Sequence, residues 1–201
     1  MKKSQANILL QPWRTPYGAP PFHQIQDADY LPAFEQAIAS ARADIVRIRE
    51  DKAEPTFWNT VAPLDTAGQL LDRVCDVFFN LLETDHTEAL ERIAEQVLSR
   101  LTRYENDMTL DKVLFARLKR VYDAAVADRG AAAGLDEEAW QLLDKTYQSF
   151  VRNGALLSDA DRETYRALSE ELADLGQRFG HHVLQAKAAY AYVTAAETEP
   201  E

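Results

Sequence analysis

Histidine and glutamate are the residue types in this chain that could hold a catalytic metal ion. A hydrolytic zinc site on a helix needs two histidines at i and i+4 with a glutamate between them, because that spacing places both imidazoles on one face. No H-E-x-x-H sequence occurs in the 201 residues. The histidines are His23, His86, His181 and His182. The adjacent pair would project about 100° apart on a helix, so we interpret both as surface residues.

Other reactive residues also have structural interpretations. Asp85, His86 and Glu88 fall at the expected start of a helix, where acidic groups complement the helix dipole. Ser158 and Ser169 have no histidine at a recognisable spacing. The paired carboxylates are interpreted as solvated helix faces: Glu137-Glu138 and Glu170-Glu171. We therefore predict no catalytic, metal-binding or cofactor-binding residue in this chain.

The composition limits the classes of partner and compartment. Thirty-three acidic and 22 basic residues give a formal net charge of −11, which argues against nucleic acids and anionic membrane surfaces. The single cysteine, Cys75, lies in an apolar helical pattern and is predicted to be a buried free thiol, as suits a reducing compartment. The apolar run at residues 8–10 is too short for a signal peptide, and no stretch suits a membrane span, so we expect a cytoplasmic protein.

The first third of the chain is predicted to be a proline-rich arm followed by two helices. Prolines at 12, 16, 20 and 21 favour an extended arm, whose Leu9, Leu10, Trp13, Tyr17 and Phe22 should lie against the body. Apolar spacing predicts a helix over residues 27–51 with Pro32 in its first turn. After a short turn at 56–59, a second helix is expected from about Thr60 to Leu82. A start at Thr56 would instead make Pro63 a kink.

Four more helices are expected after residue 84. The third is capped by Thr84 or Asp85 and runs to about Met108. The fourth and fifth are capped by Asp111 and Asp136, with a glycine-containing loop at 129–134 between them and Asn153-Gly154 at the end of the fifth. A long sixth helix follows Ser158 and continues to about residue 186. Residues 190–194 are strand-like and 197–201 acidic. The predicted fold is an all-α, antiparallel bundle of about six helices.

The aromatic residues are predicted to lie mainly in the core, because they recur at helical spacing. Trp58 and Phe79 lie off the main apolar stripe of the second helix and are expected to be exposed. As an alternative, aromatic residues could line a peptide groove. The set is Phe57, Trp58, Phe78, Phe79, Trp140, Tyr147 and Phe150.

Several blocks, in the same order, resemble the N-terminal region of the thimet oligopeptidase/peptidyl-dipeptidase family of zinc metallopeptidases. The nearest branch is the bacterial dipeptidyl carboxypeptidases, followed by enzymes like oligopeptidase A. The blocks are residues 12–22 (P-W-R-T-P-Y-G-A-P-P-F), 30–35, 55–60 (P-T-F-W-N-T), 70–74, 77–82 (V-F-F-N-L-L), 114–122, 147–157 and 171–179.

The resemblance implies an all-α enzyme whose two halves enclose a deep channel. It assigns the arm to residues 1–26, an N-terminal helical domain to 27–188, and a truncated connection toward a catalytic domain to 189–201. The helical domain would form one wall of the channel and restrict access to short peptides. Zinc and the catalytic residues lie further downstream in the family, so no site residue is carried over, and the chain alone is expected to be inactive.

Two other functions can be compared with the sequence. A stand-alone helical module that binds peptides or a partner protein remains the alternative, although the strand-like and uncapped acidic ending argues against it. A metal-storage bundle needs repeated Glu-x-x-His pairs, which the chain lacks. The partners expected are the chain's own catalytic domain and short peptides, with self-association of the 201-residue chain through uncovered apolar surface.

Overall fold

The computed structural model describes residues 6–85 and 87–190. All regular secondary structure in these ranges is helical, so the all-α prediction is confirmed. No helix within them is long and apolar enough to cross a membrane. Tyr190 follows the last helix directly. The remainder of the strand-like prediction, and the acidic ending, lie outside the described residues.

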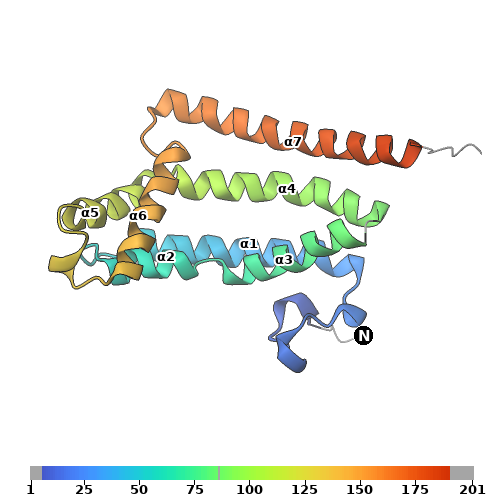
Figure 1. Ribbon diagram of the computed structural model, residues 1–201, viewed down its shortest axis with the longest axis horizontal. Helices are drawn as coiled ribbons and strands as arrows, with labels where there is room; N and C mark the ends of the chain where they lie inside the picture. The colour runs from blue at the N-terminus through green and yellow to red at the C-terminus, as the bar shows by residue number, and fades with distance from the viewer. Residues whose placement is uncertain (1–5, 86, 191–201) are drawn as a thin grey trace, which may run out of the picture.

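The helices α1, α3, α4 and α7 run side by side along the molecule, and the other helices pack at one end (Figure 1). The helices are α1 (Asp27–Glu50), α2 (Ala62–Thr66), α3 (Gln69–Thr84), α4 (Glu88–Thr109), α5 (Lys112–Ala125), α6 (Glu137–Arg152) and α7 (Asp159–Ala189). Short helical turns are η1 (Ile8–Leu10), η2 (Pro16–Gly18), η3 (Phe22–Gln24), the π-turn η4 (Phe57–Val61) and η5 (Ala131–Ala133). In Figure 1, α1, α3, α4 and α7 run in alternating directions.

One apolar core lies where α1 packs against α3 and α4. Ala33, Ala37 and Ala41 of α1 are completely buried, and their small side chains let the neighbouring helices approach closely. Tyr30 and Phe34 contact Phe78 edge-to-face, with ring centroids 5.0 and 5.3 Å apart. Edge-to-face geometry is favourable for aromatic pairs, so these rings fix α3 against the first half of α1.

A second core lies at the other end of α1. Ile45 and Ile48 of α1 pack there with η4, α5 and α6, around the fully buried Leu118 and Leu143. Tyr122 and Tyr147 stack with ring centroids 3.9 Å apart and join α5 to α6. The single helix α1 therefore contributes to both cores.

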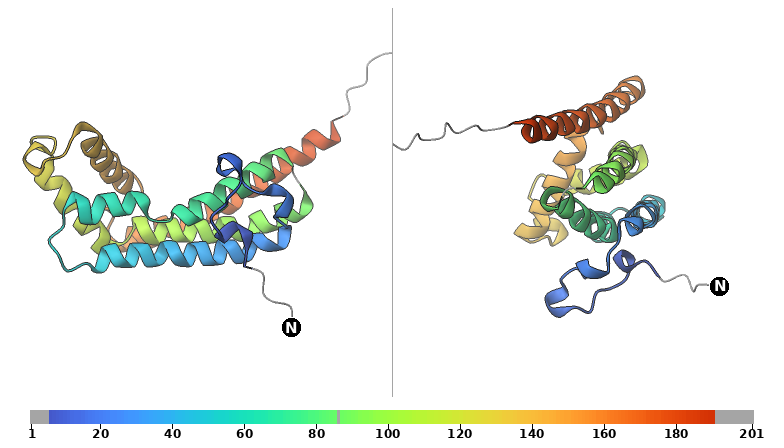
Figure 2. Two further views of the ribbon diagram at one scale, coloured as in Figure 1. Left: turned by 90° about the horizontal axis from the view of Figure 1, so that it is seen from below. Right: turned by 90° about the vertical axis from the view of Figure 1, so that its right-hand side faces the viewer.

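The N-terminal segment lies against α1 and α3, on the opposite side of the molecule from α7 (Figure 2). Leu9 is completely buried, and Arg73 of α3 donates a hydrogen bond to its carbonyl oxygen at 2.9 Å. The Arg73 guanidinium also lies over the Trp13 ring. The prediction that Tyr17 contacts the body is wrong, since Tyr17 is fully exposed. Phe22 is 45% exposed. Tyr17 lies between the parts anchored by Trp13 and by Ile25.

The second predicted helix is divided in the structure. Thr56, and not Thr60, caps its start: the Thr56 hydroxyl accepts from the Asn59 N–H at 3.2 Å, and the Asn59 side chain accepts from the Thr56 N–H at 2.8 Å. Pro63 lies in the first turn of α2, where its missing N–H is tolerated. The chain then breaks at Gly68, which has a φ of +84°. The prediction missed this break because the apolar spacing continues across it.

The other predicted helix starts are confirmed with one exception. The third predicted helix, α4, begins after Thr87, whose hydroxyl accepts from the Leu90 N–H at 3.2 Å. Thr84 and Asp85 instead end α3. The side chains of Asp111, Asp136 and Ser158 cap α5, α6 and α7 as expected.

Replacing Gly68 with alanine is expected to destabilise the fold. A Cβ at Gly68 would meet the Ala41 Cβ at 3.5 Å and the Tyr104 hydroxyl at 3.6 Å, which are ordinary contacts. The cost therefore comes from the left-handed backbone and should be about 1–2 kcal/mol in the free energy of unfolding, measured by urea denaturation. Gly180→Ala is the control: in a helix with nothing within 4 Å, it should stabilise by about 0.5–1 kcal/mol. Equal effects of the two substitutions would contradict this account of Gly68.

Candidate interaction surface

The described histidines have different surroundings in the structure. His181 on α7 contacts the Glu91 carboxylate on α4, while His182 and His23 are exposed. His86 lies outside the described residues. Within residues 6–85 and 87–190, no three His, Cys, Asp or Glu residues form a group that could hold a metal ion. The residues that the structure describes therefore do not fit a catalytic zinc ion.

Cys75 is a free thiol on α3 that is half-buried, and not fully buried as predicted. Burial, together with the negative charges of Asp72, Asp76 and Glu105, raises the pKa of the thiol to about 12. A cysteine nucleophile reacts as the thiolate. Cys75 therefore has the electrostatic environment of an inert structural cysteine.

The aromatic residues mostly occupy the cores. Trp58 is 68% exposed, as predicted. The prediction for Phe79 is wrong: this ring is half-buried and packs edge-on against Phe78 at 5.2 Å. Because the ring of Phe78 fills the core and Phe79 packs against it, both rings point toward the protein interior. Phe57, Phe78, Trp140 and Phe150 are buried.

Four exposed apolar residues form a stripe along α7, which we call the outer stripe. It consists of Leu168, Leu172, Leu175 and Phe179, which are 58%, 71%, 48% and 70% exposed. No described side chain of this 31-residue helix is fully buried. An amphipathic helix on a globular protein normally turns its apolar face inward, so α7 has the reverse orientation.

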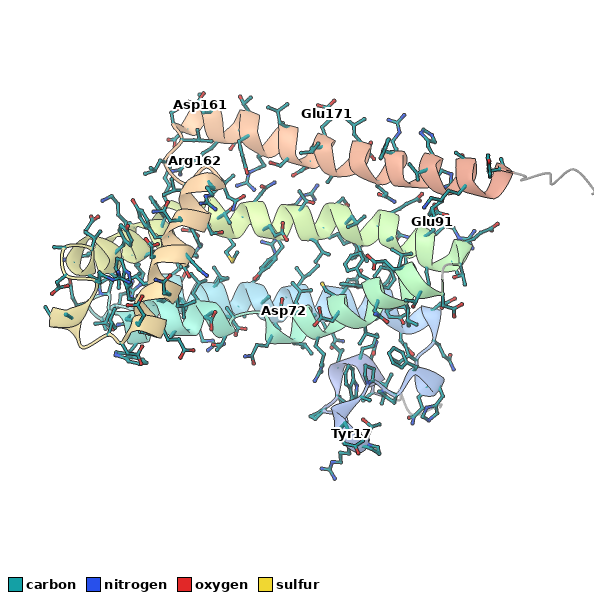
Figure 3. All side chains as sticks on the ribbon, viewed as in Figure 1. Tyr17, Asp72, Glu91, Asp161, Arg162 and Glu171 are labelled. Carbon is teal, nitrogen blue, oxygen red and sulfur yellow. The ribbon has the colours of Figure 1, made fainter. Side chains whose placement is uncertain are left out.

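Polar contacts occupy the side of α7 that faces the body. Arg166 pairs with Asp107 of α4, and Glu170 lies 3.5 Å from Arg103 of the same helix. The His181–Glu91 contact joins the two helices further along. Figure 3 shows Glu91 between α4 and α7, and Glu171 on the side of α7 that faces away from α4.

The N-terminal turn of α7 is held by hydrogen bonds to backbone carbonyl oxygens. Arg162 donates hydrogen bonds to the carbonyl oxygens of Ala155, at 2.6 Å, and Leu110, at 3.4 Å. Asp107 also pairs with Arg42 of α1 at 2.7 Å, so one carboxylate links α1, α4 and α7. These polar contacts hold α7 with its outer stripe exposed.

Apolar packing between α4 and α7 is incomplete. An open groove of about 360 Å³ lies between them, lined by Leu82, Ala94, Leu98 and Leu184 together with polar residues at its rim. The leucines of α7 do not by themselves predict its orientation. The signal that could have revealed it is the run of small or polar residues opposite the stripe, at Arg166, Glu170, Ala173 and Gln177.

Comparison with characterised proteins identifies the family. The chain is 35% identical over 183 residues to a dipeptidyl carboxypeptidase of Salmonella typhimurium and 36% identical over 180 residues to one of Escherichia coli, covering 91% and 90% of the chain. The chain belongs to the thimet oligopeptidase/peptidyl-dipeptidase family. Oligopeptidase A of Escherichia coli is a more distant relative, 22% identical over 191 residues and 95% of the chain.

The chain spans about a quarter of the length of these relatives: 26% of each dipeptidyl carboxypeptidase and 27% of oligopeptidase A. The match covers the N-terminal portion of these peptidases. No model of a protein family matches the chain.

Cys75 is expected to react very slowly with a thiol reagent while the protein is folded. With a pKa of about 12, its thiolate fraction at pH 8 is on the order of 10⁻⁴, compared with a few tenths for an ordinary cysteine. The rate with Ellman's reagent at pH 8 should rise on the order of a thousandfold in denaturing urea. Because the folded state keeps the proton, stability should fall as the pH rises above the ordinary thiol pKa. Equal rates in the folded and unfolded protein would contradict this assignment.

The substitution Asp107→Ala is expected to loosen α7 while leaving the two cores intact. It removes the contacts to Arg42 and Arg166, which should lower the local opening energy of α7 by about 1 kcal/mol. Hydrogen exchange followed by mass spectrometry should show severalfold faster exchange in residues 159–180. Asp123→Ala is the control, because it removes only the pair with Lys119 inside α5. Unchanged exchange in α7 would show that Asp107 does not hold this helix.

Proposed function

We propose that this chain is the N-terminal helical domain of a zinc metallopeptidase that cleaves short oligopeptides, of the peptidyl-dipeptidase type. The observation that carries the proposal is the match of about 90% of the chain to two dipeptidyl carboxypeptidases at 35–36% identity. In this proposal residues 1–26 are an arm, 27–188 the helical domain, and 189–201 the connection toward a catalytic domain. A cytoplasmic location belongs to the same proposal.

The proposed role of the chain is mechanical and not chemical. The helical domain forms one wall of a substrate channel and limits access to short, unfolded peptides. The outer stripe of α7 supports this role, because an apolar face of this size suits contact with another protein surface. The polar contacts of Arg166, Glu170 and His181 with α4 would hold this face toward the catalytic domain.

Zinc belongs to the proposed whole enzyme and not to the residues of this chain. The sequence contains no H-E-x-x-H, and the described residues do not form a metal-binding group. When bound, the ion would polarise the peptide carbonyl and activate water. The residues of this chain would act only by contacting the catalytic domain and limiting access to short, unfolded peptides. The chain alone would have no peptidase activity.

A stand-alone module that binds peptides or a protein partner is the second candidate. Exposed Trp58 favours it, because an indole ring on a surface can contribute strongly to binding. The two candidates differ in what the isolated chain does. A binding module would bind short peptides by itself, whereas a channel wall would require the catalytic domain.

The test is a chimaera in which this chain replaces the matching 180 residues of the dipeptidyl carboxypeptidase of Escherichia coli. We expect the chimaera to fold, bind zinc and release dipeptides from short peptides. Leu172→Glu/Phe179→Glu should lower this activity at least tenfold, because two charges would be buried against the catalytic domain. Val126→Glu is the control, since Val126 is 44% exposed at the C-terminal end of α5.

An inactive chimaera that folds and binds zinc would contradict the proposed wall. Peptide binding by the isolated 201-residue chain, measured by calorimetry, would favour the stand-alone module instead.

A further inference from the structure

The spacing of the outer stripe is that of a helix that pairs with another helix. Leu168, Leu172, Leu175 and Phe179 follow one another at intervals of four, three and four residues. This alternation places apolar residues along the seam of a two-stranded coiled coil. All four side chains are at least 48% exposed, so the seam is available along more than two turns of α7.

The charges beside the stripe favour one orientation of a second α7. Glu171 and Arg178 lie on the same flank, seven residues apart, and both are exposed. In an antiparallel pair with Leu172 packed against Leu175 of the second copy, Glu171 faces Arg178 of that copy. Two-fold symmetry produces this ion pair twice. A parallel pair would instead place Glu171 near Gly176 of the other copy. Neither of the two Glu171–Arg178 ion pairs would then form.

The opposite flank of the stripe carries small residues. Ser169 and Gly176 lie there, and a Cβ on Gly176 would meet no atom within 4 Å. In the antiparallel arrangement these two positions face each other across the seam, so the two backbones can approach closely. The stripe is thus complementary to itself in shape as well as in charge.

We propose that the 201-residue chain forms a symmetric dimer in which the outer stripes of two α7 helices pack antiparallel. Such an interface is isologous, with the same patch used by both copies. Leu168 of each copy packs against Phe179 of the other, and two Glu171–Arg178 pairs close the seam. The occupant of the stripe in the isolated chain is therefore a second copy. This inference does not depend on the proposed function and shares only the surface with it.

The test is sedimentation equilibrium of the purified chain over a concentration series, with charge-reversal variants. The wild-type chain should dimerise. Glu171→Arg and Arg178→Glu should each raise the dissociation constant at least tenfold, because like charges then face each other twice. The double variant Glu171→Arg/Arg178→Glu should return the constant to within about threefold of wild type. Glu138→Arg on α6 is the control for a change in net charge and should leave the constant unchanged.

A disulfide measurement checks the register independently. Positions 169 and 176 lie about 10.5 Å apart along one helix, too far for an internal disulfide. Ser169→Cys/Gly176→Cys should therefore form only a linked dimer on mild oxidation. Neither single variant should do so, because each cysteine faces the other position.

A monomer at all concentrations would overturn the inference, as would a dimer whose dissociation constant is insensitive to charge reversal or not restored by the double variant. The outcome is separable from the chimaera test. An active chimaera with a monomeric chain would leave the proposed function standing alone, and a charge-sensitive dimer with an inactive chimaera would leave the dimer standing alone.

Discussion

Close packing of α1 is the constraint on which the rest of the structure depends. Ala33, Ala37 and Ala41 are completely buried, so the helices beside α1 can approach without a cavity. Its far end supplies Ile45 and Ile48 to a second core, where α5 and α6 pack. Because interiors are packed at crystal-like density, a larger side chain at any of the three alanines would displace α3 or α4. Both ends of the protein would then lose their common support.

The helix α7 is held to the body by polar contacts more than by buried apolar side chains. Its contacts with the body include ion pairs and hydrogen bonds around Asp107, Arg162 and His181, and none of its described side chains is fully buried. Exposed ion pairs contribute little individually, so α7 should belong to the part of the protein that opens most easily. A helix of this kind gains most when another surface covers its apolar face. Its orientation therefore leaves the outer stripe available for contact with another surface.

The family relationship and the exposed face of α7 are the two observations that bear most directly on the role of this chain. The relatives are peptidases of which the chain matches about a quarter. Asp111 and Asp136 cap helices, and Asp107, Arg162 and His181 hold α7 against the body. Cys75, whose pKa burial raises to about 12, is held in its unreactive form. What the described structure offers is shape, together with one apolar surface directed away from its own body.

The sequence alone determined the helical class, most helix starts and the family, because these depend on local spacing and capping chemistry. Asp111, Asp136 and Ser158 identify their helices through side chains that reach only two or three residues along the chain. Tertiary structure decided the break at Gly68, where the backbone leaves the helix although the apolar spacing continues. It also turned Phe79 inward and left Tyr17 in solvent. Above all, tertiary structure decided which face of α7 meets the body. The apolar stripe in the sequence indicates only that one face of the helix will be covered by some surface. The positions of Asp107, Arg103 and Glu91 on α4 determine that the polar face of α7 packs against the body.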